Sequence, residues 1–152
     1  MGKRISKVVL ILFGAIIIGL IAASFVIKTQ NDKVAKNIVR EIKNIPVPEK
    51  TSIEDEVCAV GKLSGNGDGM QYFGAVLLKS ELSLEELQEY YGEYADSKYS
   101  DIVARQDNER VEVVEHRELR FNTDIDTEDY YIVYTWGDYD GIASELDLRG
   151  IG

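Results

Sequence analysis

The sequence predicts an α+β protein in which an N-terminal transmembrane helix precedes an antiparallel β-sheet with one main helix packed on a face. Three observations predict this class. A run of 20 residues without a charged side chain lies near the N-terminus. Strand-like apolar segments begin after a pair of prolines, and one helix with strong start signals interrupts them. The element order after the membrane is then β-β-α-β-β-β, and strands without regular β-α alternation favour an antiparallel sheet.

The charge distribution divides the chain into a basic anchor region and an acidic domain. Residues 1–44 hold 8 Lys/Arg and 2 Asp/Glu, a net charge of +6, whereas residues 45–152 hold 9 Lys/Arg and 25 Asp/Glu, a net charge of −16. Nucleic-acid binding by the domain is disfavoured, because phosphate contacts need clustered cations.

The uncharged run, residues 8–27, has the length of a transmembrane helix, since 20 helical residues span about 30 Å. A cleaved signal peptide is the alternative, and the basic residues 1–7 would suit it. The apolar run exceeds the ordinary signal-peptide core, however, and no cysteine directly follows it as in a lipoprotein. We therefore expect an uncleaved signal anchor with residues 1–7 as a cytoplasmic tail.

Orientation follows from the flanking charges and the size of the domain. Basic residues lie on both sides of the span, with Lys3, Arg4 and Lys7 favouring a cytoplasmic N-terminus. Long domains translocate largely regardless of charge. The sequence thus predicts a single-pass protein of the cell membrane, in contact with the lipid bilayer, with its C-terminal domain outside.

Residues 28–45 read as a basic juxtamembrane helix or stalk, with one apolar stripe at helical spacing: Val34, Ile38, Ile42 and Ile45. This helix either continues the membrane helix or starts anew. Its basic face would lie on anionic headgroups, or its stripe would pack on the domain. Pro46 disfavours helix at the residue before it, so the acidic domain is expected to occupy residues 46–152.

The first two strands are predicted in "EDEVCAVGKL" and "MQYFGAVLLK", with a glycine-rich stretch between them. Asn66-Gly67 and Asp68-Gly69 favour positive φ, so the stretch is interpreted as a hairpin turn. It does not match a phosphate-binding loop, because Leu63 follows Gly61-Lys62 where Ser or Thr is needed. It does not match an EF-hand, because Ala75 would occupy the position of the bidentate Glu. No cofactor is expected.

The helix after the hairpin has a complete start signal. Ser83 and Glu86 form an S-x-x-E capping box, with Leu82 and Leu87 as the accompanying apolar pair. The apolar and aromatic stripe that follows is expected to cover the sheet.

Three further strands are predicted in "SDIVARQ", "ERVEVVEH" and "DYYIVYTW". The last is the clearest, because it is rich in β-branched and aromatic residues.

Candidate reactive and metal-binding residues are few. Cys58 and His116 are the single cysteine and histidine, no motif joins them, and structural zinc lacks ligands. Asp68, Asp124 and Asp126 are weak cation candidates. The preferred interpretation of the last two is a solvated acidic edge that discourages strand pairing.

Two segments, "GKLSGNGDGMQYFGAVLLKSELSLEELQEYY" and "YYIVYTWGDYDGIASELDLRG", resemble small membrane-anchored proteins of Gram-positive bacteria that carry no assigned activity. The resemblance covers most of residues 46–150. It implies a bacterial surface setting and transfers no functional residue.

The function expected is that of a non-catalytic extracytoplasmic domain that binds a protein or a component of the cell envelope. The alternative is a hydrolase, glycosidase-like, that uses two carboxylates facing one cleft.

Overall fold

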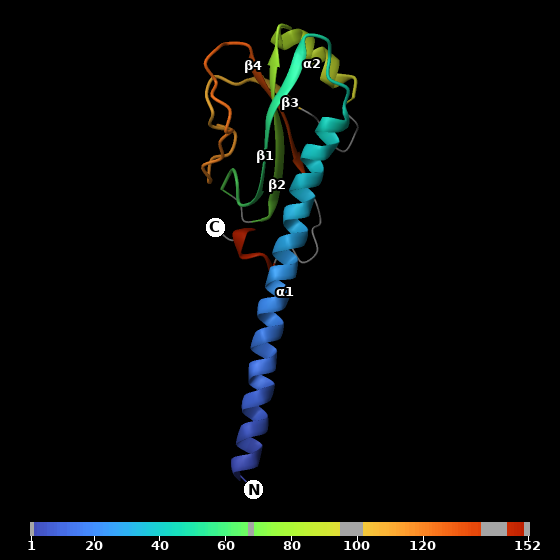
Figure 1. The fold of residues 1–152 in the computed structure, drawn as a ribbon. Coiled ribbons are helices and arrows are strands. Elements are labelled where there is room, and N and C mark those ends of the chain that lie inside the picture. Colours follow the sequence, from blue (N-terminus) through green and yellow to red (C-terminus); the bar gives the residue numbers. More distant parts are fainter. Residues whose placement is uncertain (1, 67–68, 95–101, 138–145, 151–152) are drawn as a thin grey trace.

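The computed structural model describes residues 2–66, 69–94, 102–137 and 146–150. One long helix leads into a small α+β domain (Figure 1). The elements in chain order are α1 (Gly2–Asn44), β1 (Thr51–Gly61), β2 (Gln71–Ser80), α2 (Leu84–Gly92), β3 (Ile102–Arg105), β4 (Tyr130–Gly137) and the short 3-10 turn η2 (Leu148–Gly150).

The expected fold class is confirmed at this level. A long apolar helix precedes an antiparallel sheet of four strands, in the order β1-β2-β4-β3, with a second short helix. β1 and β2 form the expected hairpin, with Thr51 opposite Ser80 and Gly61 opposite Gln71.

The strand expected in "ERVEVVEH" is wrong. In the described residues this segment forms one isolated bridge, between Arg110 and Arg120. The alternation of Val111 and Val113 suggested a strand, but the fully buried valines are Val111 and Val114, which are three residues apart. A turn brings both to the same side, with the Val114 N–H donating to the Val111 carbonyl over 3.1 Å.

Both faces of the sheet are buried, in strict alternation along β2. Tyr72, Val76 and Leu78 point into one apolar cluster, together with residues of α1 and α2. Phe73 and Leu77 point into the other cluster, which irregular chain between β3 and β4 covers. The domain therefore has three layers, with the sheet between helices and an ordered loop segment.

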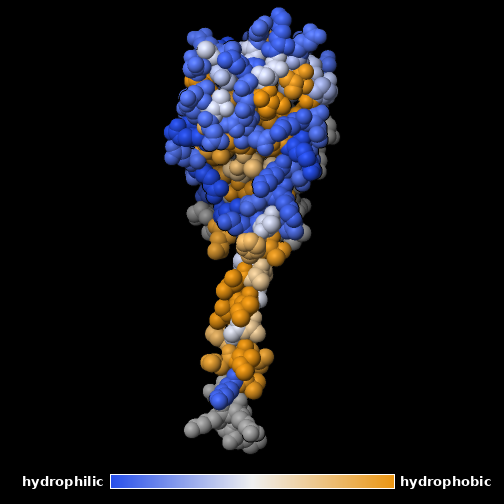
Figure 2. All heavy atoms as spheres, in the orientation of Figure 1, coloured by the Kyte–Doolittle hydropathy of each residue, from blue (hydrophilic) through white to orange (hydrophobic). Residues whose placement is uncertain are grey.

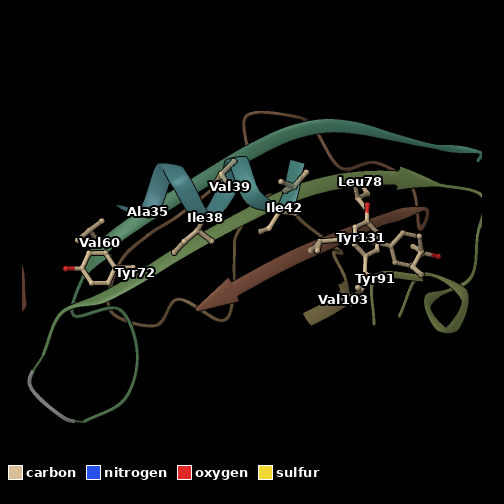
Figure 3. Close-up of a cluster of buried hydrophobic side chains, with 13 residues drawn as sticks. Ala35, Ile38, Val39, Ile42, Val60, Tyr72, Leu78, Tyr91, Val103 and Tyr131 are labelled. Atoms are coloured by element: carbon tan, nitrogen blue, oxygen red, sulfur yellow. The ribbon is translucent and has the colours of Figure 1, made fainter. Parts of the chain in front are cut away.

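The main helix on the first face is the second half of α1, because α1 continues without a break beyond the apolar run. Of the expected stripe, Ile38 and Ile42 are buried, whereas Val34 and Ile45 are only partly buried. Ala35 and Val39 complete the buried face, which lies against the strands in Figure 3. Gly74 permits the close approach, since a Cβ there would lie 2.6 Å from Ile38 Cγ2. Of the two arrangements open for residues 28–45, the stripe packs on the domain.

The chain between β1 and β2 is held by side-chain contacts. Gln71 Oε1 accepts from the N–H groups of both Leu63 and Ser64, each over 2.8 Å. Gly65 has a φ of 75° and Gly69 a φ of 143°, in the region that favours glycine. Asn66 is exposed, and Gly67 and Asp68 lie outside the described residues.

The start of α2 has the geometry of a capping box. The Ser83 hydroxyl accepts from the Glu86 N–H, and the Glu86 carboxylate accepts from the Ser83 N–H over 2.8 Å. Leu87 and Tyr91 are the buried residues of α2, so its apolar face does cover the sheet.

Candidate functional site

The N-terminal half of α1 projects from the domain. Within Lys7–Asn44 the helix is long and apolar enough to cross a membrane, and none of its most apolar window is buried. Figure 2 shows this half as a hydrophobic rod below a largely hydrophilic domain. We call the end of the domain nearest this rod the basal end and the opposite end, where β2 leads into α2, the distal end.

An open pocket of about 650 Å³ lies at the distal end. It forms where β2 ends, α2 begins and β4 starts, so short connections bring together side chains that are far apart in the sequence. Those that give it chemical character are four carboxylates, an arginine and a tyrosine: Glu81, Glu86, Glu128, Asp129, Arg105 and Tyr131. A second hollow of about 360 Å³ shares Ser80, Glu81 and Asp129 with it. We refer to the two together as the distal pocket.

Hydrogen bonds keep two of the pocket carboxylates ionised. The pKa of Glu86 is lowered chiefly because its carboxylate accepts from the Ser83 N–H. The pKa of Asp129 is lowered chiefly because the Thr127 hydroxyl donates to it. Lys79 also lies 3.8 Å from Asp129.

Arg105 does not neutralise the pocket fully. Its Nη1 donates to the Glu128 carbonyl oxygen over 2.8 Å, and its guanidinium lies 5.6 Å from the centre of the Tyr131 ring. The Glu128 carboxylate is 4.0 Å from Arg105 and almost fully exposed. The second hollow adds Lys50 and Lys79, and Lys50 Nζ lies 3.5 Å from the Glu81 carboxylate. The described lining thus has four carboxylates and three cationic side chains, and it is net negative by one charge.

The pocket carboxylates are partnered by cationic side chains or by hydrogen bonds. A glycosidase needs one carboxyl group that stays protonated, through a raised pKa. Among the described residues, each carboxylate whose pKa departs from its ordinary value departs downward, namely Glu86, Glu109, Glu118, Asp129 and Asp147.

The sequence-derived candidates do not gather into a site. Asp124 and Asp126 are exposed on the loop segment, and Asp68 lies outside the described residues. Where the chain is described, no group of three or more carboxylate, His or Cys side chains could hold a metal ion. Cys58 packs beside the α1 cluster, whereas the His116 ring contacts the Gly65 carbonyl oxygen over 2.7 Å, on the side of the other cluster.

Sequence reasoning missed a buried polar network at the basal end. Asn31 on α1 is fully buried and donates to the Asp147 carboxylate over 2.9 Å, while the Tyr72 hydroxyl donates to Asn31 over 3.0 Å. Arg149 donates to the same carboxylate from Nε over 3.0 Å and from Nη2 over 2.7 Å. Asn31 lies one turn before Ala35 on the buried stripe, which is the signal that could have revealed the network.

Arg149 also links this network to the rest of α1. Its Nη1 donates to Asp32 over 2.5 Å, and its Nη2 donates to the Lys28 carbonyl oxygen over 3.2 Å. The hydrogen bonds that Asp147 accepts, chiefly from Arg149 and also from Asn31, lower its pKa to about 2. The network fastens the η2 turn to the helix.

The resemblance to surface proteins of Gram-positive bacteria stays a prediction, because no family model, characterised protein or solved structure in the comparisons matches this chain.

Proposed function

We propose that the chain is a single-pass protein of the cell membrane that holds an acidic domain outside and binds a cationic segment of a protein or envelope component in the distal pocket. The observation that carries this proposal is the position of the pocket. Its carboxylates lie at the end of the domain farthest from the exposed apolar helix. A domain held at the membrane by that helix would present this end to a partner.

Charge supports a cationic partner. Residues 28–152, which include the part of α1 that packs on the domain, hold 14 Lys/Arg and 27 Asp/Glu, and this net charge of −13 attracts basic segments over long range and speeds their association. The lowered pKa values of Glu86 and Asp129 keep those groups negative at neutral pH. A flexible lysine- or arginine-bearing segment can therefore exchange water for carboxylate contacts without displacing a proton.

The binding test uses the full chain in lipid nanodiscs and a fluorescent oligolysine peptide as the probe. The informative variant is Glu81→Gln with Glu128→Gln, because both side chains line the pocket and neither forms the helix cap. The matched control is Glu41→Gln with Glu89→Gln, two exposed residues outside the pocket lining that change the net charge equally.

We expect fluorescence anisotropy to give at least a tenfold weaker Kd for the pocket variant and an unchanged Kd for the control, with affinity falling as salt rises. Equal weakening in both variants would mean diffuse attraction by net charge and would remove the pocket from the proposal.

Orientation is tested separately in cells whose wall has been removed. Added protease should digest the domain of intact cells and leave the membrane span. Protection of the domain until lysis would place it in the cytoplasm.

A further inference from the structure

We propose that residues 146–150, the basal turn, dock Leu146 and Leu148 into the headgroup region of the bilayer that α1 crosses. The domain would then rest on the membrane at two points, the helix and the turn, and keep one orientation. This inference rests on the proposed function in that α1 must span a membrane.

The exposure of the two leucines is the first observation. Leu146 is 66% exposed and Leu148 is 79% exposed, whereas the other large exposed hydrophobic residues outside α1 reach at most 43%. A single exposed leucine is ordinary on a soluble surface. Two of them next to a transmembrane-type helix form a local apolar surface that lipid can cover.

The direction of the side chains is the second observation. Along the turn, the charged residues Asp147 and Arg149 point into the protein, and the apolar residues Leu146 and Leu148 between and beside them point out. Asp147 is only 7% exposed. This is the reverse of the arrangement that water favours, and it matches a turn whose outer side meets an apolar medium.

The level of the turn along α1 is the third observation. Arg149 bonds the carbonyl of Lys28, which is the first charged residue after the apolar run of residues 8–27. The turn therefore lies beside the helix where the helix would leave the hydrocarbon. Figure 1 shows the turn below the sheet and next to α1, and Figure 2 shows hydrophobic surface at the base of the domain continuing onto the helix.

Backbone contacts hold the turn in this place. The Lys62 N–H donates to the Arg149 carbonyl over 2.7 Å, and the Gly69 N–H donates to the Gly150 carbonyl over 3.0 Å. A Cβ on Gly61 would lie 2.9 Å from the Arg149 carbonyl oxygen, so the β1 end fits closely against the turn. The leucines are presented by a fixed scaffold, and the exposed Lys28, whose carbonyl Arg149 contacts, suits anionic headgroups.

The test places a fluorescent label that responds to its surroundings at Leu148→Cys in the full chain, in a Cys58→Ala background. The protein is reconstituted into phosphatidylcholine–phosphatidylglycerol vesicles with or without nitroxide-bearing lipids. Glu89→Cys, on the exposed face of α2 at the distal end, carries the control label. Trp136 emission checks that each variant is folded, because the Trp136 ring lies 4.8 Å from the Phe73 ring inside the domain.

We expect a blue-shifted label at position 148 that nitroxide lipids quench several-fold more strongly than the label at position 89, and the same at Leu146→Cys. Equal quenching at positions 148 and 89, in protein that floats with the vesicles, would overturn the docking of the turn and leave the anchor intact. Protein that fails to float with the vesicles would overturn the membrane anchor, and the inference with it.

Discussion

At the scale of single residues, the carboxylate of Asp147 is a charged group that the fold holds in its interior. It is buried, accepts hydrogen bonds from Asn31 and Arg149, and has a pKa of about 2 against an ordinary value of 3.8. The folded state thus binds the Asp147 proton less readily than the unfolded state does. The carboxylate stabilises the fold fully above pH 4, and this contribution disappears as the pH falls from about 4 to about 2.

We therefore expect Asp147→Asn to lower the free energy of unfolding by about 2 kcal/mol at neutral pH, since each pKa unit corresponds to about 1.4 kcal/mol. Denaturant unfolding of the full chain in detergent micelles, followed by Trp136 emission, measures this difference. The difference should shrink as the pH falls from about 4 to about 2. The exposed control Asp124→Asn should stay within about 0.5 kcal/mol of the original protein. A loss for Asp147→Asn that does not vary with pH would contradict the role given to the charge.

Gly74 is the residue that lets α1 approach the sheet. A Cβ at this position would lie 2.6 Å from Ile38 Cγ2 and 3.0 Å from the Val39 backbone nitrogen. We expect Gly74→Ala to cost about 1–3 kcal/mol through overpacking. Ile38→Ala removes the Cγ2 atom that the new Cβ would meet, so it should cost less in the Gly74→Ala background than alone, and the double variant should be more stable than the sum of the single changes predicts. Strict additivity in the same unfolding experiment would indicate that the two residues are not in contact.

At the scale of elements, short-range signals predicted most of the structure. The hairpin and β4 could be read from glycine spacing and from β-branched and aromatic runs. The capping box could be read from Ser83 and Glu86, because all its atoms lie within one helical turn.

Elements that depend on long-range packing could not be read in the same way. Val111, Val113 and Val114 fit a strand or a turn equally well, and only the sheet face below them decides which pair is buried. The distal pocket and the basal network were invisible for the same reason. Each joins residues that are distant in the chain, such as Asn31 and Asp147.

The α2 helix gives a prediction that separates its cap from its packing. Ser83→Ala removes a hydroxyl that accepts from the Glu86 N–H and should cost about 0.5–2 kcal/mol. Leu87→Ala leaves a cavity beside the sheet and should cost about 2–5 kcal/mol, because Leu87 is fully buried. Unfolding curves of the two variants compare these losses directly. A larger loss for Ser83→Ala than for Leu87→Ala would contradict the placement of α2.

At the scale of the whole molecule, the single helix α1 has two roles. Its first half is exposed and apolar enough to span a membrane, and its second half is a core element of the domain. The sequence showed both the apolar run and the stripe of residues 28–45, but their continuity depends on long-range contacts, of Arg149 with the Lys28 carbonyl and of Asp147 with the buried Asn31. Because no loop separates the halves, the helix would transmit the orientation of the membrane span to the distal pocket.

Amide hydrogen exchange of the full chain in lipid nanodiscs tests this continuity most directly. The informative groups are the backbone N–H groups of residues 28–32, where the apolar run meets the domain. An unbroken helix fastened by Arg149 predicts that these groups exchange slowly, at rates similar to those expected for the N–H groups of Ile38 and Ile42. We expect Arg149→Ala to speed their exchange. The control Arg117→Ala, at an exposed loop position, should leave it unchanged. Rapid exchange across residues 28–32 in the unaltered protein would show a hinge between span and domain and would contradict the continuous helix.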